Sequence, residues 1–89
     1  MPNLEILNQN ADRLATVDAN FAAILGIKLT EEAVAAISVS TLALVGKWYE
    51  EHDRTLNIAE EPIEEDALRY AATGLIFTAI AAASDAMNR

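Results

Sequence analysis

Apolar residues recur at steps of three and four along the first 25 residues of the chain, which is the period of an α-helix. Asn3 stands directly before this pattern and belongs to the residue types that cap helix N-termini. Gly26 follows it and supplies the left-handed backbone conformation that often ends a helix. The pattern predicts an amphipathic helix over about residues 3–25, with apolar positions Leu4, Leu7, Ala11, Leu14, Val17, Phe21, Ile24 and Leu25.

A second helix is predicted over about residues 30–53. Thr30 is a suitable N-cap, and the two glutamates after it stand where the helix dipole favours negative charge. Residues 33–45 carry no charge, and their apolar side chains fall on more than one side, so we expect this helix to lie between neighbours. The short link before Thr30 predicts that it runs antiparallel to the first helix. We interpret Gly46 as a point where another backbone comes close. One apolar stripe of this helix is formed by Val34, Ile37, Thr41, Leu44 and Trp48.

The character of the chain changes at residues 50–66, a segment with eight acidic residues and one basic residue, Arg54. We call residues 50–66 the acidic segment; its net charge of −7 accounts for most of the net −8 of the whole chain. Pro62 suits the first turn of a helix, where its missing N–H is not needed. We therefore predict a third helix over about residues 62–87, with acidic residues at the positive end of its dipole.

Residues 70–84 contain no charged side chain, and on a helical projection nearly the whole circumference is apolar. A helix of this kind is buried in a larger core or in lipid. A membrane span needs about 20 apolar residues and is commonly flanked by basic residues, whereas this run is shorter and its flanks are acidic. We therefore expect no membrane insertion and interpret the run as a surface that holds copies of the chain together. The predicted contact face is formed by Tyr70, Gly74, Phe77, Thr78 and Ala81.

These patterns predict one all-α domain over residues 1–89, an antiparallel bundle of three main helices completed by self-association, most simply as a twofold dimer. Composition adds two restrictions. Direct binding to nucleic acid or to an anionic membrane is disfavoured, because a chain with net charge −8 would be repelled by both. The chain has no cysteine, and its first fifteen residues lack the basic and apolar regions of a signal peptide, so we expect a cytoplasmic protein.

Residue types that carry catalysis are sparse. His52 is the only histidine, so HExxH cannot form, and an inward Glu-x-x-His motif is excluded because position 49 is a tyrosine. The three glycines are far apart and make no phosphate-binding loop. We therefore predict a protein that is not an enzyme and has no catalytic residue, no metal site and no cofactor.

Two aromatic residues, Trp48 and Tyr49, stand at the edge of the acidic segment. In a structural interpretation Trp48 closes the apolar stripe of the second helix. In a functional one the pair is an interface anchor, which receives a lysine or arginine by cation–π contact while nearby acids form ion pairs. We predict a partner-binding surface formed by Trp48, Tyr49, Glu50, Glu51, Asp53, Glu60, Glu61, Glu64 and Glu65.

The predicted function is that of a non-catalytic, homo-oligomeric module that presents the acidic segment to a basic partner protein. An inhibitor, a nucleic-acid mimic, or an accessory factor of the kind found in phages and mobile elements would act in this way. Two alternatives remain open. One is a purely structural helical oligomer, and the other is a small-molecule binder that uses a crevice between copies of the chain near Gly46 and Gly74.

Overall fold

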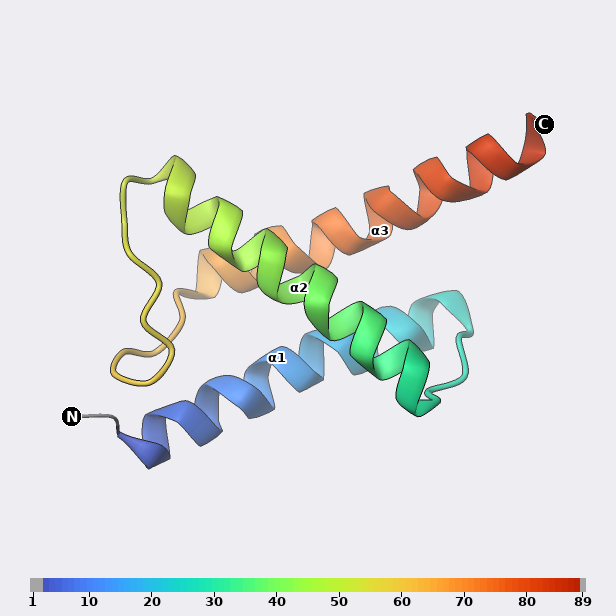
Figure 1. Ribbon diagram of the computed structural model, residues 1–89. Helices are drawn as coiled ribbons and strands as arrows, with labels where there is room; N and C mark the ends of the chain where they lie inside the picture. Colours follow the sequence, from blue (N-terminus) through green and yellow to red (C-terminus); the bar gives the residue numbers. More distant parts are fainter. Residues whose placement is uncertain (1–2, 89) are drawn as a thin grey trace.

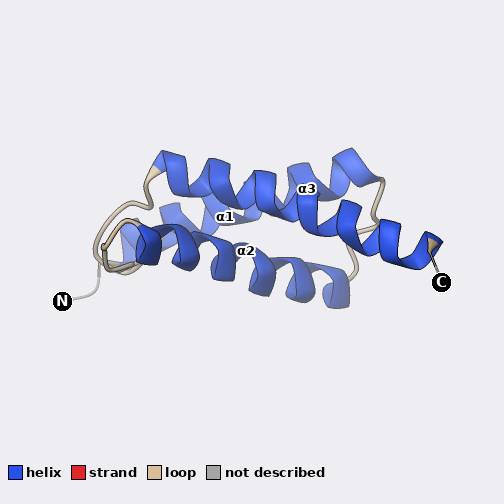
Figure 2. Ribbon diagram, turned by 90° about the horizontal axis from the view of Figure 1, so that it is seen from above, coloured by secondary structure: helices blue, strands red, loops and turns tan. Residues whose placement is uncertain are grey.

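The computed structural model describes residues 3–88, and three helices make up most of this part of the chain (Figure 1). They are α1 (Leu4–Leu25), α2 (Glu31–Glu51) and α3 (Glu65–Met87). Residues 3–88 contain no strand. Each helix packs against both others, and each runs back along its predecessor, as Figures 1 and 2 show. The predicted all-α bundle of three helices is therefore confirmed.

The predicted caps at both ends of α1 and at the start of α2 are present. The Asn3 side chain accepts hydrogen bonds from the backbone N–H groups of Glu5 and Ile6, at 3.0 and 3.3 Å. Gly26 takes the left-handed conformation with φ +68°, and Thr30 Oγ1 accepts from Ala33 N at 3.1 Å. These caps satisfy backbone groups that have no partner within a helix, so the local sequence sets where α1 begins and ends and where α2 begins.

The end of α2 and the start of α3 differ from the prediction. Helix α2 stops at Glu51 rather than near 53, because Asp53 adopts a left-handed conformation and Arg54 N donates back to Tyr49 O at 2.9 Å. Helix α3 begins at Glu65, so the prediction that Pro62 opens it is wrong. The backbone before Glu65 is held instead by hydrogen bonds to α1 and α2, which override the local preference of proline.

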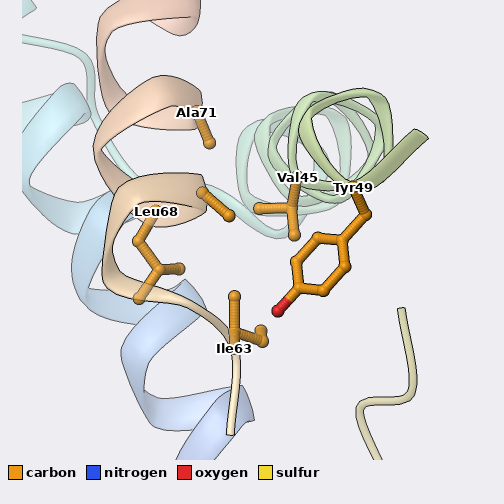
Figure 3. Packing of buried hydrophobic residues seen from close by; sticks show 6 residues of the cluster. Val45, Tyr49, Ile63, Leu68 and Ala71 are labelled. Atoms are coloured by element: carbon orange, nitrogen blue, oxygen red, sulfur yellow. The ribbon is translucent and has the colours of Figure 1, made fainter. Parts of the chain in front are cut away.

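The core consists of two adjoining clusters between the helices. One contains Val45, Tyr49, Ile63, Ala67, Leu68 and Ala71, and Figure 3 shows Tyr49 reaching from α2 toward Ile63, which precedes α3. The other contains Phe21, Ala22, Ile37 and Leu75. Of the stripe predicted on α2, Ile37 and Thr41 are buried, Leu44 and Trp48 are half-buried, and Val34 is exposed.

Helix α3 is buried along only part of its length. Ala67, Leu68, Ala71 and Leu75 lie in the core, whereas every described residue from Ala81 onward is exposed. The last turns extend past the ends of the other two helices (Figures 1 and 2). The expectation that this helix is covered on all sides is thus not met within one chain, because α1 and α2 do not extend alongside its last turns (Figure 1).

The close helix approach occurs at Gly74 and not at Gly46. A Cβ atom at Gly74 would lie 2.9 Å from Leu44 Cδ2, so the missing side chain lets α2 and α3 come together there. At Gly46 no atom of the described chain lies within 4 Å of that position, apart from its chain neighbours and the nearby backbone of α2 itself. The interpretation of Gly46 as a close contact is therefore wrong for the single chain.

Replacing Gly46 by alanine is expected to stabilise the fold by about 0.5–1 kcal/mol, because alanine favours a helix interior and meets open space there. Urea unfolding followed by circular dichroism measures the change. Gly26→Ala is the matched control, expected to destabilise by about 1 kcal/mol or more because of its left-handed φ. A loss of stability in Gly46→Ala would contradict the open space, and would point to a second chain packed on this site.

Candidate functional site

Asn10 on α1 holds the acidic segment in place. Its side-chain amide donates to Ile58 O at 2.9 Å and to Glu61 O at 2.8 Å, and its oxygen accepts from Ile63 N at 3.0 Å. The residue is only 1% exposed. A single buried side chain therefore fixes three backbone groups that lie about fifty residues further along the sequence.

Further contacts tie the acidic segment to α1 and α2. Arg13 donates to Ile63 O at 2.8 Å and forms an ion pair with Glu65, also at 2.8 Å. Asn3 N donates to Ala59 O at 2.7 Å. The connection between α2 and α3 is thus anchored at several points and does not depend on regular secondary structure for its shape.

Tyr49 supports the acidic segment from beneath. It is 4% exposed, and its hydroxyl accepts a hydrogen bond from Glu64 N at 2.9 Å. The Arg54 guanidinium lies 5.5 Å from the centre of its ring. The chain's own arginine therefore occupies the cation–π position that we predicted for a partner, and Tyr49 is not accessible as an interface anchor.

Trp48 is half-buried and lies beside the acidic segment. Its ring stacks on His52 with centroids 4.0 Å apart, and it meets the Tyr49 ring edge-on at 5.2 Å. His52 Nδ1 lies 2.7 Å from Trp48 O. Of the two predicted aromatic anchors, Trp48 is thus the one that stays partly exposed.

Two of the predicted acids are already paired within the chain. Glu64 bonds to Arg54 at 2.9 Å, and this hydrogen bond raises the pKa of the Arg54 guanidinium above its ordinary value. Glu65 is the partner of Arg13. These pairs leave less negative charge for a partner than the composition of the segment indicates.

The remaining acids of the segment are exposed. Glu60 accepts a hydrogen bond from the Asn57 amide at 2.9 Å. Within residues 3–88 no ion pair involves the four carboxylates of Glu50, Glu51, Asp53 and Glu61. Three of these carboxylates lie at the end of α2, and that of Glu61 lies in the turn before Pro62.

The predicted self-association face is divided. Gly74 packs on Leu44 of α2, and Tyr70 is half-buried. Thr78 Oγ1 donates to Gly74 O at 2.8 Å and so serves its own helix. Phe77, which is 66% exposed, and Ala81 remain open to solvent.

Helix α3 is long and apolar enough to cross a membrane, and it is the one helix in the described chain with this property. Helices of soluble proteins also reach this length and hydropathy, so these two properties alone do not assign α3 to lipid.

Sequence reasoning missed the most connected polar residue, Asn10. Its spacing from Val17 and Phe21 places it on the apolar stripe of α1, where an amide needs buried partners. A polar residue on this apolar stripe could have indicated a buried side chain with hydrogen-bond partners. It could not reveal the partners, which lie far along the chain.

The described residues contain no cluster of three or more histidine or carboxylate side chains arranged to hold a metal ion. Comparisons of the chain with models of protein families, with curated proteins and with solved structures found no match.

Proposed function

We propose that this chain is a non-catalytic protein-binding module, which presents the acidic segment to a basic partner protein and associates with further copies of itself. The observation that carries the proposal is the fixation of the segment by Asn10 through three hydrogen bonds. A surface that is already ordered loses little conformational entropy when it binds, so its contacts contribute more fully to affinity.

The charge of the segment indicates the chemistry of the partner. Of the four exposed carboxylates without an ion pair in the described chain, three lie within residues 50–53, close in sequence to the half-buried Trp48, and the fourth is that of Glu61. Opposite charge on a partner would accelerate encounter and select against acidic proteins. Trp48 would supply apolar contact at the margin of this surface.

A matched pair of charge variants tests the acidic surface. The segment variant neutralises the four exposed acids of the segment that form no ion pair in the described chain. Asparagine is chosen at position 53 because it tolerates the left-handed backbone there. The control variant neutralises four exposed acids elsewhere, so both change the net charge equally. The segment variant carries Glu50→Gln, Glu51→Gln, Asp53→Asn and Glu61→Gln, and the control carries Asp12→Asn, Glu31→Gln, Glu32→Gln and Asp85→Asn.

Immobilised wild-type protein is expected to retain basic proteins from a native lysate, with binding that weakens as salt screens the charges. The control variant should retain the same proteins, and the segment variant should lose about tenfold or more in affinity for them, because several ion pairs disappear together. Equal retention by both variants would refute a role for the acidic segment.

A second candidate is a structural helical oligomer in which the acids only maintain solubility. It is favoured by large apolar side chains that one chain leaves exposed on α2 and on the distal half of α3, namely Val39, Leu42, Phe77, Ile80 and Met87. An oligomer that forms normally and retains no partner protein would favour this candidate over the first.

A further inference from the structure

A groove of about 490 Å³ lies between α1 and α2, on a part of the surface that shares no residue with the acidic segment. Its volume is within the range of about 300–1,000 Å³ that is usual for small-molecule sites. The lining is almost wholly apolar, with three alanines and one leucine from α1 on one wall and larger side chains from α2 and its preceding link on the other. These are Ala11, Leu14, Ala15, Ala19, Leu29, Val34 and Leu42.

One carboxylate, that of Asp18, contributes to this apolar lining. Asp18 is 7% exposed, although it lies on a helix whose other acids are at the surface. None of the ion pairs among residues 3–88 includes it. A buried carboxylate is costly unless hydrogen bonds or an opposite charge compensate it.

Two hydroxyl groups of α2 serve the Asp18 carboxylate. Ser38 Oγ donates to one oxygen at 3.0 Å, and Thr41 Oγ1 donates to the other. The Thr41 hydroxyl also lies 2.9 Å from Ile37 O, and because it carries a single hydrogen, the two acceptors share it. An ionised carboxylate can accept about four hydrogen bonds, so Asp18 retains capacity for a further donor.

We propose that this groove binds a small organic cation, an amine whose protonated nitrogen is held by Asp18 and whose apolar body lies against the groove walls. An ammonium group supplies further donors and a compensating positive charge to a carboxylate that already accepts from two hydroxyl groups. An apolar body covers side chains of Leu29, Val34 and Leu42 that are partly exposed in the single chain. The net charge of −8 also favours a cation over an anion.

A charged ligand and its neutral counterpart separate the role of charge from that of apolar contact. Cyclohexylmethylammonium is the probe and cyclohexylmethanol its neutral counterpart, and binding is followed by NMR shifts of the Leu29, Val34 and Leu42 methyl groups. The ammonium ion is expected to bind wild-type protein saturably at millimolar concentration. The alcohol should bind about tenfold more weakly or worse, because hydrogen bonds between charged groups are the stronger ones.

Two variants locate the site. Asp18→Asn keeps the size of the side chain and removes its charge, and is expected to weaken ammonium binding about ten- to a hundredfold. Ala15→Leu fills the groove without altering the carboxylate and should abolish binding. Because leucine suits a helix, this variant is expected to fold, and it tests the site even if Asp18→Asn does not fold. Asp12→Asn is the control, because it removes the same charge from an exposed position on α1 and should bind as wild type does.

Equal binding of the ammonium ion and the alcohol would overturn the proposal, as would unchanged ammonium binding by Asp18→Asn or the absence of saturable binding. The proposal would also be overturned if a second copy of the chain, and not a small cation, occupies the groove. In that case the methyl shifts would follow protein concentration, and the ammonium ion would bind only on dilution.

Discussion

Asn10→Ala is expected to destabilise the protein by about 2–4 kcal/mol, one of the largest effects of any single polar substitution in this chain. The change removes three hydrogen bonds at once. It leaves Ile63 N without its acceptor in a buried position, and buried polar groups without partners cost roughly 1–3 kcal/mol each. The carbonyls of Ile58 and Glu61 are partly reached by water, which limits the total. A domain of this size has only about 4–13 kcal/mol of stability.

Urea unfolding measures this loss, and amide hydrogen exchange at Ile63 tests its location, because that amide should exchange much faster once its acceptor is gone. Asn8→Ala is the control on the same helix, and we expect it to change stability by less than about 0.5 kcal/mol since Asn8 is exposed. Asn10→Asp is a sharper variant of nearly the same shape. Its carboxylate would face the carbonyl oxygens of Ile58 and Glu61, so wild-type stability in Asn10→Asp would contradict the assigned hydrogen bonds.

The sequence predicted correctly those features of the fold that depend only on neighbouring residues. The period of apolar residues, the Asn3 and Thr30 caps and the left-handed Gly26 act within a few residues of each other, so they are visible without knowledge of the fold. The three helices and their order follow from them.

The boundaries near the acidic segment depend on contacts across the chain. Pro62 suits a first helical turn, but Ile63 N donates to Asn10 and Glu64 N donates to Tyr49, and both bonds hold the backbone outside the helix. Ile63 is also buried in the core, which favours the same arrangement. A local preference of proline cannot predict such a result, because the competing partners lie on other helices.

The prediction of the acidic surface was limited in the same way, because contacts across the chain cannot be seen in the composition. The sequence predicts an acidic surface, but it cannot show that Arg13 pairs with Glu65 or that Arg54 lies over the Tyr49 ring. These contacts divide the predicted surface into acids that are paired within the chain and acids that remain open. They also turn Tyr49 from a proposed anchor into a buried support.

Alanine substitutions at the two phenylalanines should differ greatly in their effect on stability, because one ring is buried and the other is exposed. Phe21 is 8% exposed and packs with Ala22, Ile37 and Leu75. Removing a buried phenyl ring loses its transfer free energy and leaves a cavity, so we expect Phe21→Ala to destabilise the protein by about 3–5 kcal/mol. Chemical denaturation monitored by circular dichroism measures the loss.

Phe77→Ala removes the same atoms from the exposed face of α3 and is expected to change the stability of a single chain by less than about 0.5 kcal/mol. If copies meet on this face, the variant should instead weaken self-association, because Phe77 is the largest apolar side chain that the single chain leaves open there. Light scattering on a sizing column compares the two proteins at micromolar concentration. A wild-type mass of 9.6 kDa would refute self-association, and an oligomer unchanged by Phe77→Ala would move the contact to another surface, such as the outer face of α2 around Val39.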